Sequence, residues 1–184
     1  MVVALAGRRI DPPNADVPRF PLKNKALVKE RIRLFFREHQ VSVLCCSASC
    51  GADLLALEAC FEAAIPYWIV LPFDPQTFKK KSVTDRPGNW VSIYNKVIKE
   101  AKEKERLIIL GLESSIEDSF KKVNEMMLAQ AKWLHSTISN GENGLAALVI
   151  WEGHAKSQGD FTEHFRTIAQ KEGFSVSFID TLGP

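Results

Sequence analysis

Short apolar runs alternate along the chain with segments whose apolar residues recur at helical spacing. Several runs are rich in the β-branched and aromatic residues that suit buried strands. Six of them have strand length: Val2 to Ala6, Val41 to Cys46, Tyr67 to Leu71, Leu107 to Leu110, Leu145 to Trp151 and Phe174 to Ile179. The pattern therefore predicts six strands.

Between these runs, apolar residues return every three or four positions, which is the spacing of one helical face. Three such faces are formed by Val28, Ile32, Phe35 and Phe36; by Trp90, Tyr94, Val97 and Ala101; and by Phe120, Val123, Met127, Ala131 and Leu134. Further helices are expected over Leu54 to Ile65 and after Asp160. Helices are thus predicted between the strands all along the chain.

Near-continuous apolar strands that alternate with amphipathic helices are typical of a parallel sheet covered on both faces. We therefore predict an α/β fold: a doubly wound, mostly parallel six-stranded sheet with helices on both faces, in a Rossmann-like arrangement. The length of 184 residues fits one domain, and we expect residues 1–184 to form it.

Composition narrows the class of protein. Hydrophobic residues make up 46% of the chain and charged residues 25%, which excludes a disordered tail and a small disulfide scaffold. The 24 basic residues nearly balance the 22 acidic ones, so the charge does not favour an extended nucleic acid as partner. Small molecules and proteins are the more natural partners.

No apolar run is long enough to cross a bilayer, and the first residues lack the pattern of a signal peptide. We therefore expect a cytoplasmic protein without membrane contact, in which Cys45, Cys46, Cys50 and Cys60 stay reduced. Adjacent cysteines do not easily share one tetrahedral metal, and the four histidines are scattered, so we predict neither a metal site nor a cofactor.

In a doubly wound sheet, ligands bind beyond the carboxyl ends of the strands. After the first strand, Gly7 permits close backbone approach and Arg8 is predicted to grip a phosphate or carboxylate. The alternative is an ordinary surface turn.

The segment after the second strand is the strongest local feature. It offers small hydroxyl residues and a glycine at a predicted helix start, in the order Ser47, Ala48, Ser49, Cys50, Gly51, Ala52 and Asp53. Its amides and hydroxyls, with the helix dipole, are expected to bind an anion, and Asp53 is expected to hold a ribose hydroxyl. Simple helix capping by Ser47, Ser49 or Asp53 is the alternative.

Two later connections also fall at the predicted ligand edge. Gly159 and Asp160 open the last helix and are expected to meet an anion or a sugar. The connection from Pro72 to Trp90 is long for this fold, so we expect a lid-like loop whose Lys79-Lys80-Lys81 run is solvated. The alternative is that Lys81 binds a phosphate.

Helical spacing places two polar residues inside apolar stripes, Glu58 and Asn124. Buried polar groups need partners, which the backbone can supply. A desolvated Glu58 would have a raised pKa and would suit a general acid or base, and it would equally suit a ribose-binding carboxylate.

Several of these segments together resemble a known group of proteins. They are Gly7 to Arg9; Ser47 to Asp53 followed by Glu58; Leu71-Pro72-Phe73 with Phe78 and Ser82-Val83; Asn124; and Trp151-Glu152-Gly153. In this combination, along nearly the whole chain, the sequence resembles bacterial Rossmann-like domains of the SLOG superfamily. That superfamily includes the Lonely-guy phosphoribohydrolases, the DNA-processing DprA proteins and sensor domains for nucleotide-derived signals.

The resemblance is greatest to the sensor-like members, which implies a nucleotide-binding domain whose output lies in an effector partner. Where those relatives carry Gly-Gly-Thr, this chain has Gln158-Gly159-Asp160, so a carboxylate replaces a neutral side chain near the expected phosphate. The Lonely-guy phosphate motif is also absent from the sequence.

We therefore expect the protein to bind a nucleotide or nucleotide-derived small molecule, as a sensor or signalling module. The alternative is an N-glycoside hydrolase or transferase acting on a nucleotide, of the phosphoribohydrolase, deoxyribosyltransferase or NAD-cleaving type, with Glu58 as the catalytic carboxylate. Amphipathic outer helices often pair in such domains, so we also expect a homodimer.

Overall fold

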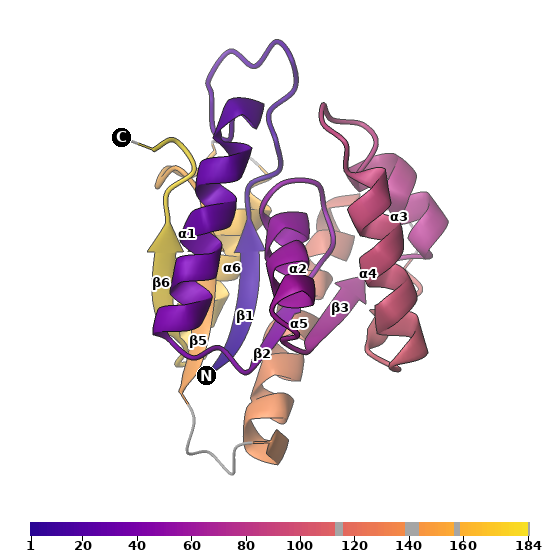
Figure 1. Cartoon of the computed structure of the whole chain (residues 1–184), viewed down its shortest axis with the longest axis vertical. Helices are drawn as coiled ribbons and strands as arrows, with labels where there is room; N and C mark the ends of the chain where they lie inside the picture. The colour runs from indigo at the N-terminus through magenta and orange to yellow at the C-terminus, as the bar shows by residue number, and fades with distance from the viewer. Residues whose placement is uncertain (113–115, 139–143, 157–158, 184) are drawn as a thin grey trace.

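Six strands form one parallel sheet, as the alternating pattern predicts. A computed structural model describes residues 1–112, 116–138, 144–156 and 159–183 of the chain. The strands are β1 (Val2–Gly7), β2 (Val43–Cys46), β3 (Tyr67–Leu71), β4 (Leu107–Ile109), β5 (Leu145–Ile150) and β6 (Ser175–Ile179). Their order across the sheet is β4-β3-β2-β1-β5-β6, which confirms the predicted Rossmann-like α/β class (Figure 1).

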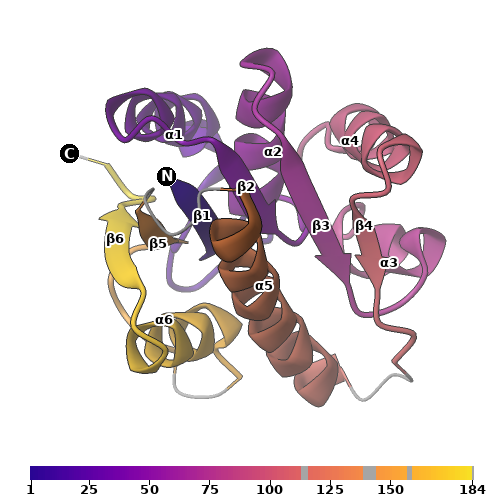
Figure 2. The same cartoon turned by 90° about the horizontal axis from the view of Figure 1, so that it is seen from below.

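Helices cover both faces of this sheet. They are η1 (Leu22–Asn24), α1 (Lys25–Glu38), α2 (Ala52–Glu62), α3 (Pro75–Ser82), α4 (Val91–Glu103), α5 (Ile116–Ile138) and α6 (Phe161–Lys171). Figure 2 shows α1, α2 and α4 on one face and α5 and α6 on the other. This doubly wound arrangement leaves the ends of the strands open for a site.

Helix α3 is a correction to the predicted long loop after β3. Asp74 accepts hydrogen bonds from the amides of Gln76 and Thr77, and Pro75 occupies the first helical turn. An Asp-Pro pair is a helix-start signal, but Phe78 is the single large apolar side chain that α3 buries. One buried apolar residue makes no periodic pattern, so the helix was missed.

The central strands explain the near-continuous apolar runs. Every residue of β2 is buried, and β1 and β5 are buried except for one end residue each. The edge strands β4 and β6 are partly exposed, as expected where helices cover less of the sheet. Among the described residues, no helix combines the length and apolar character needed to span a membrane.

The strand order reverses beside β1. Strands β1 to β4 follow one another toward one edge, whereas β5 lies on the other side of β1 and β6 beyond it. The chains that leave β1 and β5 therefore diverge to opposite sides, and the space between them is the usual ligand site of such a sheet.

Candidate ligand pocket

A pocket of about 400 Å³ opens at this reversal point, a volume that suits a small molecule. Its lining comes from the end of β1 and the chain up to Pro12, the loop after β2 with the start of α2, the end of α3, helix α5 and the start of α6, together with Arg19, Arg86 and Lys156. Of the predicted ligand residues, those in the lining are Gly7, Arg8, Ser47, Ser49, Asp53, Asn124, Gly159 and Asp160. The structure thus brings together segments that are far apart in sequence.

Gly7 is required by close packing under the pocket. A Cβ at this position would lie 2.4 Å from the Ala52 Cβ and 2.7 Å from the Ile150 carbonyl oxygen. Strand β1 therefore approaches both the start of α2 and strand β5 more closely than any side chain allows. Small residues at positions 7 and 52 are therefore needed where β1 packs against α2, next to the pocket residues Arg8 and Asp53.

Gly51 has a similar packing role. Its φ is +108°, and a Cβ there would lie 2.6 Å from the Arg8 carbonyl oxygen. Arg9 and Gly51 form an antiparallel bridge, and the Ala52 amide donates to the Arg8 carbonyl. The loops after β1 and β2 are thus hydrogen-bonded to each other.

This pairing corrects the predicted anion cradle at the start of α2. The Ser49 amide donates to Asp53, the Cys50 amide to the Ser82 carbonyl and the Ala52 amide to the Arg8 carbonyl. Neither Gly51 nor Ala52 lines the pocket. These three amides, which were expected to bind a ligand anion, donate instead to acceptors of the protein in the same segment, at the end of α3 and after β1.

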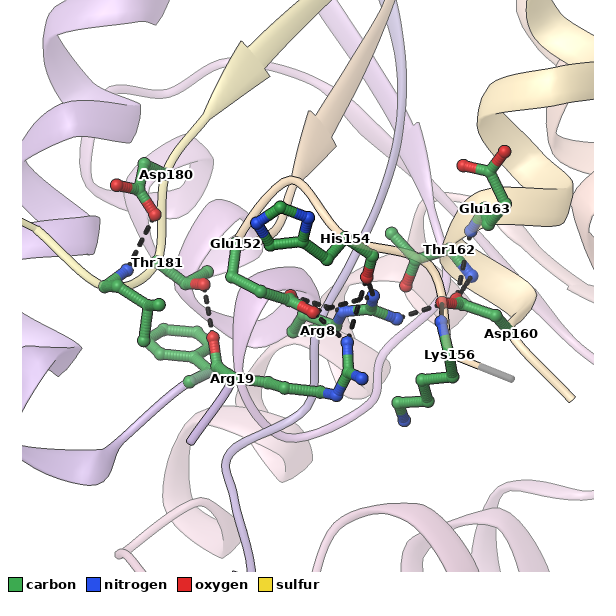
Figure 3. A network of polar contacts seen from close by, with 12 residues as sticks. Arg8, Arg19, Glu152, His154, Lys156, Asp160, Thr162, Glu163, Asp180 and Thr181 are labelled. Carbon is green, nitrogen blue, oxygen red and sulfur yellow. Dashed lines mark hydrogen bonds and ion pairs between the residues drawn. The ribbon is translucent and has the colours of Figure 1, made fainter. Parts of the chain in front are cut away.

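Arg8 is also committed to the protein. Its Nε donates to Glu152 at 2.7 Å, its Nη1 to Asp160 at 2.7 Å, and its Nη2 to Glu152 at 3.0 Å and the His154 carbonyl at 2.6 Å. Figure 3 shows the guanidinium between the two carboxylates. Burial disfavours the charge, but the two carboxylates outweigh it and raise the pKa of Arg8. Arg8 was predicted to bind a ligand anion, but its guanidinium donates to Glu152 and Asp160 instead.

Asp160 occupies the anion position at the start of α6. Its Oδ1 accepts from the amides of Thr162 and Glu163 as well as from Arg8, and its Oδ2 accepts from the Lys156 amide. Burial raises the pKa of this carboxyl, but the Arg8 and backbone hydrogen bonds outweigh it and lower the pKa. The carboxylate therefore fills the place where an anion at the start of α6 was predicted. Gln158 lies outside the described residues.

Arg19 and Glu152 complete this network and were not predicted as site residues. Arg19 forms an ion pair with Glu152 and donates to the His154 carbonyl at 2.9 Å. The Glu152 side chain is only 4% exposed. Glu152 directly follows the predicted fifth strand, which is a usable signal, whereas Arg19 lies in an irregular segment whose position no pattern predicts.

Asp53 is the buried carboxyl of the pocket wall. Its Oδ2 accepts the Ser49 amide at 3.0 Å, and the side chain is almost fully enclosed. Burial raises its pKa to about 7, against the opposing effects of Ser49 and the Arg9 charge. Asp53 is therefore able to gain or lose a proton near neutral pH, a property common among acid-base groups.

Asn124 links α5 to the start of α6 and lines the pocket. Its Nδ2 donates to the Phe161 carbonyl at 2.8 Å and lies 3.1 Å from the His164 Nδ1. Burial lowers the pKa of His164, which favours the neutral ring that accepts this bond. Within the described residues the Asn124 Oδ1 has no partner, so it remains able to accept from a ligand.

Glu58 lies elsewhere, which corrects its predicted place in an apolar stripe. Its carboxylate pairs with Lys29 of α1 at 2.8 Å, and 29% of the side chain is exposed. Helix α2 is buried on nearly all sides, so apolar periodicity identifies no inner face. Glu58 is absent from the pocket lining, and the carboxyl with the environment expected for it is Asp53.

Three buried polar atoms lack a hydrogen-bond partner in the described structure, and all belong to residues of this pocket. They are Arg9 Nε, Ser47 Oγ and Arg86 Nε. A buried polar group without a partner costs about 1–3 kcal/mol. Across the pocket the lining includes the apolar side chains of Phe120, Val123, Met127 and Phe161. The pocket thus has a polar wall that contains hydrogen-bonding atoms without partners and an apolar wall that is partly aromatic.

The four cysteines are all buried and unpaired. Burial raises the pKa of the Cys46 thiol, and it also raises that of Cys50 despite the nearby Arg9. These thiols stay protonated and are poor nucleophiles. Among the described residues, no group of histidine, cysteine and carboxylate side chains has an arrangement suited to a metal ion.

Comparison of the sequence with known protein families and with curated proteins gives no match. Among solved structures, the chain is similar to the X-ray structure of DNA processing protein A (DprA) from Streptococcus pneumoniae, with 15% sequence identity and a TM-score of 0.42. The match covers 95% of this chain and 57% of that chain. It concerns the path of the backbone and carries no information on ligand or activity.

Proposed function

We propose that this protein binds a nucleotide or nucleotide-derived small molecule in the pocket at the carboxyl edge of the sheet. One observation carries the proposal: the three buried polar side-chain atoms that lack a partner among the described residues all belong to residues lining one pocket, which also has an apolar wall. An apolar and aromatic wall accepts the flat face of a base, and polar groups opposite it bind sugar and phosphate oxygens.

The other contacts have distinct chemical preferences. Asp53 and the Asn124 Oδ1 suit hydroxyl or amino donors of a ligand, and Ser47 suits either a donor or an acceptor. Together with the sequence resemblance, this favours a sensor or signalling domain of the SLOG superfamily. An effector protein would then recognise the ligand-bound form of the domain.

The test is native mass spectrometry of the purified protein, repeated under denaturing conditions, followed by calorimetry with a panel of nucleosides, nucleotides and nucleotide sugars. We expect a co-purified molecule of nucleotide mass or binding by at least one member. If the folded protein carries nothing and the whole panel fails to bind, the proposal is wrong.

A second function, cleavage or transfer of an N-glycosidic bond, is favoured by one specific feature. Asp53 is a pocket carboxyl whose pKa of about 7 suits an acid or base at neutral pH. Asp53 thus replaces Glu58 as the residue for this role.

The matched pair Asp53→Asn and Glu58→Gln separates the two carboxyls. If the protein is an N-glycosidase, base release from nucleoside monophosphates or from NAD should fall at least about 100-fold in Asp53→Asn and remain unchanged in Glu58→Gln. Equal rates in all three proteins would exclude Asp53 from catalysis, and absence of base release by the unmodified protein would exclude the activity.

A further inference from the structure

The cationic side chains of the pocket fall into two clusters with different charge balance. The α6-side cluster comprises Arg8, Arg19 and Lys156, which face Glu152 and Asp160. The α3-side cluster comprises Arg9, Lys81 and Arg86, of which the two arginines pair with Asp85. The balance within each cluster decides where a ligand anion is bound.

The α6-side cluster holds three cations and two carboxylates, an excess of one positive charge. Arg8 pairs with both Glu152 and Asp160, and Arg19 pairs with Glu152. Lys156 is the remaining cation, and its side chain extends away from the carboxylates (Figure 3). Burial and the neighbouring Arg8 charge lower the pKa of Lys156. An anion arriving here would meet two buried carboxylates that already satisfy the arginines.

The α3-side cluster has a larger excess, with three cations for one ion-paired carboxylate, Asp85. The Asp53 carboxyl also interacts with the Arg9 charge, but burial raises its pKa to about 7, so it offsets this excess only in part at neutral pH. Arg9 forms an ion pair with Asp85, and the Arg86 Nε lies 3.6 Å from the other oxygen of that carboxylate. Two guanidinium groups therefore share one carboxylate. Lys81 adds a third cation, whose Nζ lies 5.0 Å from the Phe73 ring centroid and forms no ion pair within the described part of the chain.

The same cluster contains two of the three unmet hydrogen-bond donors. Among the described residues Arg9 Nε has no acceptor, and Arg86 Nε has only the Asp85 Oδ2 at 3.6 Å, which is beyond hydrogen-bond distance. Asp53 is close enough to Arg9 for the two charges to interact, but no hydrogen bond joins them, and its Oδ2 accepts the Ser49 amide. Paired guanidinium groups with free N–H donors are suited to a phosphate or carboxylate.

We infer that a ligand of this pocket places an anionic group, of phosphate or carboxylate type, against Arg9, Lys81 and Arg86 and not at the start of α6. The inference about the whole ligand rests on the proposed function, whereas the anion subsite rests on the charge balance alone. The sequence offers a phosphate role for Lys81 only as the alternative to a solvated lysine run, and no pattern selects Arg9 or Arg86.

Nuclear magnetic resonance of the arginine Nε–H groups tests the subsite directly. Inorganic pyrophosphate and, separately, citrate are titrated into the ¹⁵N-labelled protein at constant ionic strength, with Arg9→Lys and Arg86→Lys used for assignment. We expect saturable shifts of the Arg9 and Arg86 Nε–H signals with at least one anion and a much smaller shift of Arg8, whose Nε is already bonded to Glu152. Shifts confined to Arg8 or Arg19, or no saturable shift, would overturn the inference.

Lysine variants provide the matched control. Both lysines are exposed, but Lys81 lines the pocket and its neighbour Lys80 does not. Lys81→Ala should weaken binding of the effective anion about tenfold, whereas Lys80→Ala should leave it within about twofold. Equal losses in both variants would indicate a diffuse surface field and contradict the subsite.

Nucleoside and nucleotide pairs separate this inference from the proposed function. If the 5′-monophosphate binds more tightly than its nucleoside, Lys81→Ala should remove most of that difference and leave nucleoside affinity unchanged. A phosphate advantage lost in Lys156→Ala instead would place the anion at the α6 side. If an inorganic anion shifts Arg9 and Arg86 but no nucleotide binds, the subsite stands and the proposed function fails.

Discussion

The Nη1 of Arg8 donates to the Oδ1 of Asp160 at 2.7 Å, and the same oxygen caps helix α6. One carboxylate thus joins the end of β1 to the start of α6. The two residues lie 152 positions apart, and their side chains are 3% and 6% exposed. This buried ion pair holds together the two elements that diverge from the reversal point of the sheet.

Asp160→Asn should destabilise the protein through loss of this pair. Asparagine retains helix capping, so the substitution removes mainly the charge opposite Arg8. Breaking a buried ion pair costs about 3–5 kcal/mol, and Arg8 keeps Glu152, so we expect a loss of about 2–3 kcal/mol in urea unfolding. Asp74→Asn is the control, because Asp74 caps α3 in the same way without an arginine. Equal losses would show that capping, not the ion pair, stabilises this site.

The buried carboxyl of Asp53 should make stability depend on pH. Its pKa rises from 3.8 in the unfolded chain to about 7 in the folded protein, so between these values the folded state binds more protons. The free energy of unfolding therefore falls as pH rises through this window. From pH 5 to pH 8 the contribution of Asp53 should fall by up to about 3 kcal/mol.

The measurement is urea unfolding of the unmodified protein and Asp53→Asn at pH 5 and pH 8. The difference between the two proteins isolates Asp53 from groups such as His164, whose lowered pKa acts in the opposite direction. Parallel pH profiles would mean that Asp53 is ionised throughout and that its burial is overcome by its partners.

Gly7→Ala should destabilise the protein by about 1–3 kcal/mol, because the added methyl overlaps the Ala52 Cβ and the Ile150 carbonyl oxygen. The pocket walls would be forced apart, so ligand affinity should fall too. Gly144→Ala is the control, since the nearest atom to a Cβ there is the flexible Met1 Cε at 3.3 Å. Chemical unfolding and calorimetry measure both effects; indistinguishable variants would contradict the packing role of Gly7.

Ser47→Ala should have opposite effects on stability and on binding. The Ser47 hydroxyl is buried without a partner, so its removal should leave the ligand-free protein at least as stable, within about 1 kcal/mol. Ligand affinity should fall about tenfold through loss of one hydrogen bond. Thermal unfolding without and with ligand checks both. Reduced stability without ligand would show that the hydroxyl already has a partner.

The fold was predictable because its signal is local. Apolar runs such as Leu145 to Trp151 correspond to a strand buried on both faces, and amphipathic faces such as that of Tyr94 and Val97 are the buried faces of helices. Helix α3 was not predicted because it buries one large apolar residue, Phe78, and a single residue defines no helical periodicity.

The position of the site at the ends of the strands was predictable, but which of its polar groups have no protein partner was not. Chain position puts Arg8 at the end of a central strand, but nothing local indicates that Asp160 lies 2.7 Å away. Glu58 was misplaced because a helix apolar on all sides has no polar face to compare. Partner choice among charged residues depends on tertiary distances, and these distances determine which charges remain for a ligand.

Asp160 also affects how the pocket is built before any ligand arrives. An anion bound from solution would leave with the ligand and release the charges of Arg8 and the α6 amides. The Asp160 carboxylate is part of the chain and cannot leave. Arg8 and the α6 amides are therefore desolvated during folding and not again at each binding event. The α6 side of the pocket therefore keeps its shape when empty, and ligand exchange there requires no counter-ion to enter or depart.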